Sequence, residues 1–237
     1  IPVTASVFVD STIDCFGDDN AQITISANGG VGGFEFSIGG AFQSDSVFTN
    51  LVPGNYSITV QDSIGCDTIL ALNISEPTQL LASFTDTVNI SCNGDSTGSA
   101  TVTPSGGTPP YSYLWNDPNN QTDSTAIDLP AGTYNVTVSD SNGCDTILSI
   151  NLNEPTLLTA QISDTLNVSC NGQSDGSATV TPAGGTVPYT YQWDDPSNQT
   201  DSIATGLGAG TYNVTVTDAN SCDTVVSVTI TEPAVLT

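Results

Sequence analysis

The sequence predicts an all-β protein built from three tandem β-sandwich units. One unit recurs at a period of about 78 residues, most clearly where GSATVTPSGGTPPYSYLW at 98–115 returns as GSATVTPAGGTVPYTYQW at 176–193. Runs rich in β-branched residues, such as NVTV and SITV, lie between turns containing Gly, Pro and Asn, and no apolar pattern of helical period accompanies them. Self-similarity at a fixed period is typical of an array of small domains rather than of a single enzyme fold.

A Glu-Pro pair closes each copy, at Glu76–Pro77, Glu154–Pro155 and Glu232–Pro233. We therefore expect domains at 1–77 (the most diverged copy), 78–155 and 156–237, the last including the start of a further linker at 234–237. Proline fixes its own φ and favours an extended preceding residue, so the links should be short and stiff. The predicted assembly is a rod of end-to-end sandwiches, and we expect it to be a piece of a longer secreted protein.

Within the second copy, five segments combine apolar alternation with flanking turn residues. These predicted strands lie within QLLASFTDTVNI (79–90), SATVTP (99–104), YSYLW (111–115), GTYNVTVSD (132–140) and CDTILSINL (144–152). Short strands at this spacing favour a β-sandwich with Greek-key pairing.

Aromatic residues recur at matching places in the copies. Trp115 and Trp193 occupy the position of a core tryptophan on a central strand, where the first copy has Ile38. Tyr111 and Tyr113 share the face of Trp115, and phenylalanines replace them in the first copy. Exchange among hydrophobic residues is what core packing requires, so we prefer a core to the alternative, an aromatic platform for a glycan.

A tyrosine follows Gly at the start of a predicted strand in every copy, as Tyr56, Tyr134 and Tyr212. This arrangement resembles a tyrosine corner, in which the hydroxyl group bonds an upstream backbone carbonyl. We prefer this structural role to a role in ligand binding.

The chain has no Lys, Arg or His and 25 Asp and Glu residues, for a formal net charge of −25. Side-chain salt bridges are therefore excluded, as are direct nucleic-acid binding and docking on an anionic membrane, which both need cationic side chains. No apolar run is long enough to span a bilayer, so we expect no membrane insertion.

Most carboxylates are expected to face water, and divalent-cation sites are the alternative. Clustered oxygens suit calcium, although none of the clusters matches a known calcium loop. The weak calcium candidates are Asp140, Asn142 and Asp145 around the last turn, and Asp86 and Asp164 near the unit junctions. No other cofactor is expected.

No catalytic centre is expected, because a Ser or Thr nucleophile would have no His or Lys to act as its base. The adjacent pairs Asp18–Asp19 and Asp194–Asp195 point to opposite faces if they lie on strands, so they make a poor glycosidase pair. We predict that the protein is not an enzyme.

Each copy has two cysteines, and the six are Cys15, Cys66, Cys92, Cys144, Cys170 and Cys222. The simplest connectivity pairs them within a copy, as Cys15–Cys66, Cys92–Cys144 and Cys170–Cys222. Each bridge would stabilise its small unit by roughly 4 kcal/mol. Zinc is a poor alternative, because a copy offers only two thiols and no histidine. Persistent disulfides imply an extracytoplasmic compartment.

The motifs SCNG, GSATVTP, GGTPPYSYLW and GTYNVTV followed by NGCDT resemble the SprB-type repeat of very large surface adhesins from gliding and related Bacteroidota. The resemblance covers essentially the whole chain and is weakest in the first copy, where CFGDDN replaces SCNG. It implies immunoglobulin-like or PKD-like sandwiches in long arrays. It also implies export by type IX secretion to the cell surface, and a role in adhesion or gliding motility.

The same resemblance implies O-glycosylation at an Asp-Ser/Thr pattern, which is similar to the O-glycosylation sequon of these bacteria. The alternative is a set of turns in which these side chains bond the nearby backbone. The candidate sites are Ser11, Ser46, Ser63, Thr68, Thr87, Ser96, Ser124, Thr146, Thr165, Ser202 and Thr224. The best candidates are the columns Ser46, Ser124, Ser202 and Thr68, Thr146, Thr224.

Two functions follow from this reading. The first is a structural stalk or filament segment of a large secreted surface adhesin, whose partners are adjacent repeats of the same chain and laterally assembled copies. The second is an adhesion module that binds a surface glycan or protein. The near-identity of the loops in the second and third copies favours the stalk.

Overall fold

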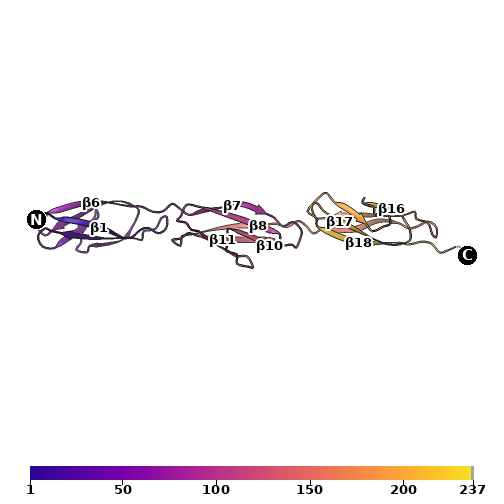
Figure 1. Cartoon of the computed structure of the whole chain (residues 1–237), viewed down its shortest axis with the longest axis horizontal. Helices are drawn as coiled ribbons and strands as arrows, with labels where there is room; N and C mark the ends of the chain where they lie inside the picture. The colour runs from indigo at the N-terminus through magenta and orange to yellow at the C-terminus, as the bar shows by residue number, and fades with distance from the viewer. Residues whose placement is uncertain (236–237) are drawn as a thin grey trace. The chain divides into compact units, whose positions relative to one another are not determined.

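A computed structural model of the protein describes residues 1–235, and within that range every regular element is a β-strand (Figure 1). The chain forms two compact units, and the strands of its second repeat contribute to both. Unit 1 comprises Ile1–Phe84, Val102–Ser124 and Asn135–Leu148; unit 2 comprises Thr85–Thr101, Thr125–Tyr134 and Ser149–Thr237. The predicted linker start at 234–237 lies partly outside the described residues.

The first repeat lies wholly in unit 1 and forms two three-stranded sheets. Its strands are β1 (Thr4–Ser11), β2 (Ala21–Asn28), β3 (Phe34–Ser37), β4 (Val47–Leu51), β5 (Gly54–Asp62) and β6 (Asp67–Ile74). The sheets have the orders β1-β2-β4 and β3-β5-β6, with antiparallel pairing. This division of strands is that of an immunoglobulin-type sandwich without its fourth strand.

The third repeat lies wholly in unit 2 and has the same topology. Its strands are β13 (Thr159–Leu166), β14 (Gly176–Ala183), β15 (Thr190–Trp193), β16 (Ile203–Leu207), β17 (Gly210–Thr217) and β18 (Asp223–Ile230). They form the sheets β13-β14-β16 and β15-β17-β18. Antiparallel pairing again runs through both sheets.

The second repeat supplies the intervening strands. They are β7 (Leu81–Val88), β8 (Gly98–Ser105), β9 (Ser112–Trp115), β10 (Thr125–Leu129), β11 (Gly132–Ser139) and β12 (Asp145–Leu152), in the sheets β10-β8-β7 and β12-β11-β9. The predicted all-β fold of tandem immunoglobulin-like units is therefore confirmed. The expected boundaries after 77 and 155 fall in the segments between β6 and β7 and between β12 and β13, and they stay a prediction.

One strand in each repeat was not predicted: β4, β10 and β16. The register of each slips against its neighbour near the end of the strand. A residue with positive φ lies inside each of them, at Asn50 (57°), Asp128 (55°) and Gly206 (69°). Such a residue interrupts the two-residue alternation from which a strand is recognised.

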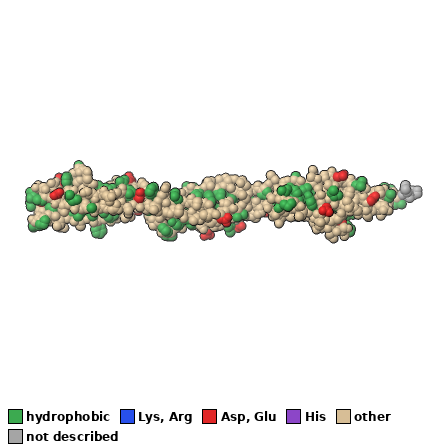
Figure 2. Space-filling view, turned by 90° about the horizontal axis from the view of Figure 1, so that it is seen from above, with side chains coloured by type: hydrophobic (Ala, Val, Ile, Leu, Met, Phe, Trp, Pro, Cys, Tyr) green, Lys and Arg blue, Asp and Glu red, His purple; other side chains and the backbone are tan. Residues whose placement is uncertain are grey.

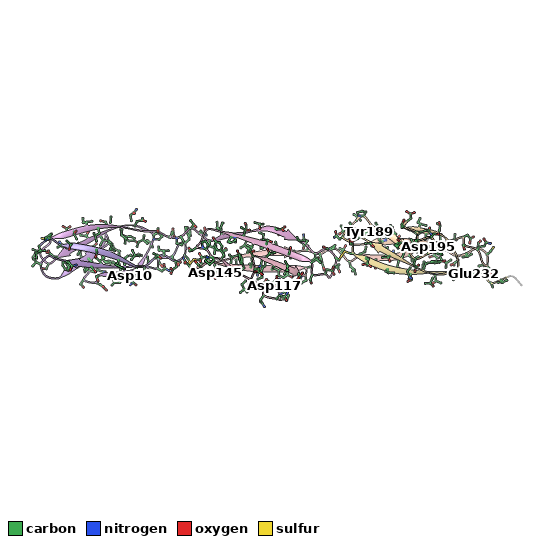
Figure 3. All side chains as sticks on the ribbon, in the orientation of Figure 1. Asp10, Asp117, Asp145, Tyr189, Asp195 and Glu232 are labelled. Atoms are coloured by element: carbon green, nitrogen blue, oxygen red, sulfur yellow. A yellow bond between two sulfur atoms is a disulfide. The ribbon has the colours of Figure 1, made fainter. Side chains whose placement is uncertain are left out.

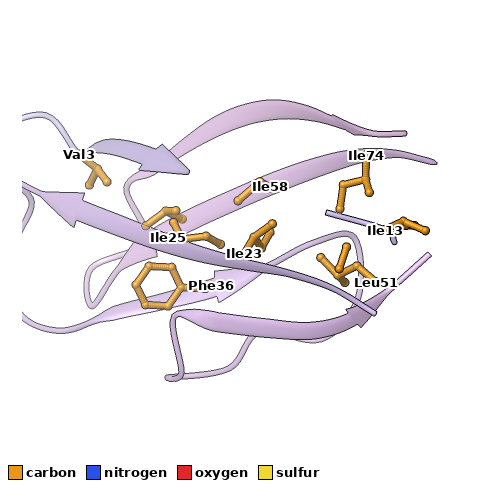
Figure 4. Close-up of a cluster of buried hydrophobic side chains, with 10 residues drawn as sticks. Val3, Ile13, Ile23, Ile25, Phe36, Leu51, Ile58 and Ile74 are labelled. Atoms are coloured by element: carbon orange, nitrogen blue, oxygen red, sulfur yellow. The ribbon is translucent and has the colours of Figure 1, made fainter. Parts of the chain in front are cut away.

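The core of the first repeat is made by alternate residues of the facing sheets. Ile23 and Ile25 of β2 are buried against Ile58 and Val60 of β5, and Figure 4 shows these isoleucines between the ribbons of the two sheets. The opposite faces of these strands are more exposed, which is the period-two pattern of a strand with one face on a core.

The predicted core role of the tryptophans is confirmed. Trp115 and Trp193 are fully buried, and their indole N–H groups donate to the carbonyls of Asp123 and Asp201 at 2.9 Å. A buried ring cannot form a glycan platform. In the first repeat, the corresponding Ile38 is only half-buried against the core.

The tyrosine corner is confirmed in every repeat. The hydroxyl groups donate to a carbonyl four residues upstream: Tyr56 to Val52 at 2.8 Å, Tyr134 to Pro130 at 2.8 Å and Tyr212 to Gly208 at 3.1 Å. The hydroxyl therefore ties the start of β5, β11 and β17 to the preceding turn.

The surface carries charge of a single sign. Figure 2 shows acidic side chains scattered over the visible face, with no cationic side chain among them. Within residues 1–235, no helix is long and apolar enough to cross a membrane.

Candidate functional site at the repeat joints

Two disulfides join successive repeats. In unit 1, Cys15 of the first repeat is bonded to Cys144 of the second, and in unit 2, Cys92 of the second is bonded to Cys222 of the third. The Cα–Cα distance is 5.6 Å in both. Each bridge therefore connects the first cysteine of one repeat to the second cysteine of the next.

The predicted pairing within repeats is wrong, and so is the expectation that all six cysteines are bonded. Cys66 and Cys170 carry exposed free thiols, and Cys15–Cys66, Cys92–Cys144 and Cys170–Cys222 do not form.

Strand length explains why the two cysteines of one repeat stay apart. Cys66 directly precedes β6. The loop that carries Cys15 is hydrogen-bonded to Glu76, which lies just beyond the other end of β6. An eight-residue strand spans about 25 Å. A disulfide needs Cα atoms within about 7 Å, so these cysteines cannot meet.

The loop around each first cysteine is anchored by the Glu-Pro pair that closes the same repeat. The backbone N–H two residues after the cysteine donates to the glutamate: Gly17 to Glu76 at 2.7 Å, Gly94 to Glu154 at 2.6 Å and Gly172 to Glu232 at 2.8 Å. These glycines have φ between 79° and 86°, a backbone region that favours glycine. Figure 3 labels Glu232 in the third repeat. The Glu-Pro pair, which the sequence analysis treated only as a boundary, therefore fixes the cysteine loop.

An asparagine reinforces this anchor in the SCNG loops. The side-chain amide of Asn93 donates to the Pro155 carbonyl at 3.0 Å, and that of Asn171 donates to the Pro233 carbonyl at 3.2 Å. Both residues of the Glu-Pro pair thus hold the loop that carries the first cysteine.

The turn around each second cysteine is built on a buried aspartate: Asp62, Asp140 or Asp218. The carboxylate of Asp140 accepts N–H groups from Thr108 (2.8 Å), Asn142 (2.9 Å) and Cys144 (3.0 Å). Asp62 and Asp218 accept the equivalent three donors at 2.8–3.1 Å.

The electrostatics of these aspartates follow from that geometry. Burial acts to raise the pKa of Asp140, but the N–H donors of Thr108, Cys144 and Asn142 outweigh it, so the pKa lies below its ordinary value. The pKa values of Asp62 and Asp218 are lowered by the same balance of burial and backbone donors. The charged carboxylate therefore holds each cysteine in a fixed turn.

One hydrogen bond crosses each joint beside its disulfide. The side-chain amide of Asn142 donates to the Asp14 carbonyl at 2.8 Å, and that of Asn220 donates to the Ser91 carbonyl at 2.9 Å. The first repeat has Ile64 in place of this asparagine, and Ile64 is 66% exposed. No signal in the sequence indicated that this asparagine contacts the preceding repeat.

The calcium candidates do not form a common site. Asp140 is occupied by backbone donors, Asn142 is a donor across the joint, and Asp145 (labelled in Figure 3) is exposed. Asp86 and Asp164 are exposed and each accepts the N–H of the next residue at 2.9 Å. Within the described residues, no three Cys, Asp or Glu side chains are placed to hold a metal ion.

The loop after β15 contains a buried aspartate that sequence analysis did not recognise as structural. Asp195 accepts the N–H groups of Ser197 (3.0 Å) and Gln199 (2.9 Å), and the Gln199 amide at 3.0 Å. Burial acts to raise its pKa, but these donors lower it below the ordinary value. Asp194 instead accepts the backbone and side-chain N–H of Asn213 at 2.7 Å. The two carboxylates thus serve separate structural bonds.

Asp117 plays the same part after β9. It accepts the N–H groups of Asn119 (2.9 Å) and Gln121 (2.8 Å), and burial and donors again oppose each other with a lowered pKa as the result. The recurring Asp-Pro-x-Asn-Gln was the signal that could have predicted this turn.

The O-glycosylation candidates differ in exposure. Exposed candidates are Ser11, Ser63, Thr87, Ser96 and Thr165, although the Ser63 hydroxyl donates to the Val31 carbonyl at 2.6 Å. The two favoured columns are half-buried: Ser46, Ser124 and Ser202 before β4, β10 and β16, and Thr68, Thr146 and Thr224 on β6, β12 and β18. The latter three strands are sheet edges.

Fold and joints together define a class: tandem immunoglobulin-like sandwich repeats linked by disulfides. The family model SprB repeat matches three segments, 10–41, 84–120 and 162–198, one in each repeat. All three repeats therefore match the SprB repeat model, as the sequence resemblance indicated. This match supports an adhesin-type repeat of a cell-surface protein. No curated protein sequence matches the chain.

Several solved structures share a distant likeness. Three N-terminal domains of the highly immunogenic outer capsid protein of bacteriophage RB49 are 12% identical, with TM-score 0.42, over 98% of this chain and 100% of theirs. An intimin fragment in complex with its receptor's binding domain is 14% identical, with TM-score 0.37, over 70% and 69%. Invasin, a bacterial integrin-binding protein, is 11% identical, with TM-score 0.35, over 98% and 60%.

Proposed function

We propose that the chain is a mechanical stalk segment of a large secreted surface adhesin, exported by type IX secretion and acting in surface attachment or gliding. The observation that carries this proposal is the pair of disulfides between repeats. They close loops with sequence separations of 129 and 130 residues, and the loops overlap between 92 and 144.

Overlapping loops limit how far the chain extends when its ends are pulled. The shortest covalent path runs from the N-terminus to Cys15, across to Cys144, back to Cys92, and across to Cys222. That path holds about 80 residues, or about 280 Å when fully stretched, against about 800 Å for the whole chain. A segment built in this way transmits load even after its sandwiches unfold.

The chemistry of the chain agrees with a role without catalysis. Ser and Thr hydroxyl groups have no His or Lys base anywhere in the sequence. The buried carboxylates are ionised acceptors of backbone N–H groups, so they are poor proton donors at neutral pH.

Single-molecule force spectroscopy tests the mechanical role. The oxidised protein, held by its two termini, should stop extending near about 280 Å, and the reduced protein should reach about 800 Å. The Cys66→Ser variant is the matched control, since it removes a thiol that forms no bridge and should leave the limit unchanged. Equal extension with and without reductant would refute the load path.

We also propose that O-glycans cover part of this surface. The exposed candidates Ser11, Thr87, Ser96 and Thr165 are the most accessible, and the two half-buried columns are less so. Edge strands are often protected from pairing with other chains by lysine side chains, which this protein lacks. Attached sugars would give its edge strands the same protection. Intact-mass and glycopeptide analysis of protein from its own cells is the test, and a mass equal to the bare oxidised chain would refute the proposal.

A ligand-binding module is the second candidate, favoured by the rigid loops that follow β9 and β15. Each loop is held by a buried aspartate, which reduces the entropic cost of binding. Its test is an array of glycans and surface proteins probed with the wild-type protein and with a variant whose 196–200 loop is replaced.

A further inference from the structure

The two free thiols occupy the two halves of a joint. Cys170 lies in the same SCNG motif as Cys92, which is bonded, and Cys66 lies in the turn equivalent to those of Cys144 and Cys222. The same disulfide forms twice within the chain from the equivalent residues, with the same hydrogen bond beside it. Each free cysteine therefore has a known type of partner.

The loop at Cys170 already has the structure that its bonded counterpart has. The Gly172 N–H donates a hydrogen bond to the Glu232 carboxylate, and the Asn171 amide donates one to the Pro233 carbonyl, as the equivalent groups do in the loop of Cys92. The carbonyl of Ser169 corresponds to that of Ser91, which accepts the Asn220 amide in the bonded joint.

Clefts beside these cysteines show the same correspondence. The cleft at the bonded joint is lined from both sides: Cys92, Asn93 and Asp95 on one, and Ser221, Cys222 and Asp223 on the other, with Leu157 and Leu158 between them. The cleft at Cys170 is lined by the equivalents of the first side and of the linker: Ser169, Cys170, Asn171, Pro233, Ala234 and Val235.

The turn at Cys66 is likewise formed in advance. Asp62 holds the N–H groups of Ile64 at 3.1 Å and Cys66 at 2.9 Å, as Asp218 does for Asn220 and Cys222. It departs from them at Ile64, whose side chain cannot donate the hydrogen bond that crosses the other joints, and at Val31, which stands where they have Thr108 and Thr186.

We propose that Cys170 and Cys66 are complementary halves of the same joint, so that each bonds the corresponding cysteine of an adjoining repeat, and two copies of this chain supply such repeats to each other head to tail. The pair of thiols is oxidised by exchange with one low-molecular-weight disulfide such as oxidised glutathione. One thiol forms a mixed disulfide and releases one glutathione thiol, and the second thiol displaces the other glutathione. Because this contact joins two different surfaces, each coupled pair keeps one free thiol of each kind for further coupling.

Random coupling of exposed thiols is the competing process, and it would also give Cys66–Cys66 and Cys170–Cys170 pairs. Two preformed halves favour the mixed pair, because little backbone must be ordered when they meet. Copies with a formal charge of −25 repel one another, so salt should promote the coupling.

The test mixes two single variants of the full chain, Cys66→Ser and Cys170→Ser, in a glutathione redox buffer. Each variant alone should stay monomeric, and the mixture should give heterodimers in about tenfold or greater excess over homodimers. Non-reducing peptide mapping should find Cys66 linked to Cys170, with Cys15–Cys144 and Cys92–Cys222 intact. Homodimers in comparable yield, or monomers alone with both thiols accessible to alkylation, would overturn the proposal.

A second pair of variants probes whether the new bond reproduces the internal joints. Ile64→Asn, introduced into the Cys170→Ser chain, restores the missing donor and should raise the heterodimer yield several-fold. Ile64→Ala in the same chain is the matched control, because it removes the same apolar side chain without adding a donor. If Ile64→Asn gives no more heterodimer than Ile64→Ala, the geometry of the internal joints does not apply between copies.

Discussion

The first and third repeats share a topology, but they differ in the middle of the core and agree at the ends. At the centre, the third repeat has fully buried Trp193, where the first has half-buried Ile38 and relies on Phe36, which is 7% exposed. At the ends, both keep the buried aspartate, the glutamate anchor and the tyrosine corner. Packing tolerates exchange of hydrophobic residues, whereas the cysteine-bearing turns depend on specific hydrogen bonds.

The largest expected effect tests the difference between the cores of the first and third repeats. Trp193→Ala should destabilise the third repeat by about 3–5 kcal/mol, because it removes a fully buried ring and leaves a cavity. Ile38→Ala should cost the first repeat clearly less, because Ile38 is a smaller side chain that is only partly buried. Denaturant unfolding of each variant measures both values, and an equal loss would show that the two centres are equally packed.

Substitution of a glycine is expected to give the next largest loss of stability. Gly184 has a φ of 73°, and an added Cβ would lie 2.1 Å from the carbonyl oxygen of Leu157. Gly184→Ala should therefore cost about 2 kcal/mol or more, because both the backbone and the neighbouring linker must shift. Gly33→Ala in the first repeat is the control, as nothing lies within 4 Å of its added Cβ. Thermal unfolding that affects both variants alike would contradict this reading.

The shared turn predicts a pH dependence. The pKa values of Asp62, Asp140 and Asp218 are lowered in the folded state, so their contribution to stability is present above the unfolded pKa of about 3.9. That contribution is lost as the pH falls through the folded pKa values. Melting temperature should therefore decrease below about pH 4.

The matched variants for this pH dependence are Asp218→Asn and Asp201→Asn. The first should lower the melting temperature at pH 7 and flatten its fall in acid, because the turn no longer loses a charge. The second changes an exposed carboxylate and should alter neither. A wild-type melting temperature that is constant from pH 7 to about pH 3 would contradict the role of the buried aspartates.

The smallest effect concerns the feature that the repeats share most closely. Tyr56→Phe and Tyr212→Phe each remove one hydroxyl that donates to a backbone carbonyl, at 2.8 and 3.1 Å. Each should cost about 0.5–1.5 kcal/mol, and the two should be alike within that range. Denaturant midpoints measure the pair, and a loss confined to one repeat would show that only one corner contributes.

Much of the fold could be predicted from the sequence, because its signals are local. The alternation in SATVTP and GTYNVTV, and the Gly-x-Tyr at the start of β5, β11 and β17, predicted the strands, the core and the tyrosine corner. The strand β10 escaped prediction because Asp128 with positive φ interrupts its alternation. The Asn142 contact escaped because it depends on which turn of the next repeat lies beside Asp14.

The disulfide connectivity failed for a different reason, although its signal was present. Cysteine spacing shows which residues recur, and not which end of a sandwich they occupy. Five predicted strands that alternate in direction place the turn after the first strand and the turn after the fourth at opposite ends. Cys15 lies in the former and Cys66 in the latter, so counting strand directions would have excluded a bond within the repeat.

The overlap of the two disulfide loops also determines what happens when a protease cuts the chain. A cut anywhere between Cys15 and Cys144 leaves two fragments held by the first bridge, and a cut between Cys92 and Cys222 leaves two held by the second. No single cleavage between residues 15 and 222 therefore releases a piece of the protein. On a cell surface exposed to foreign proteases, such a segment loses its continuity only after a second cut, or after one cut combined with reduction of the bridges that span it.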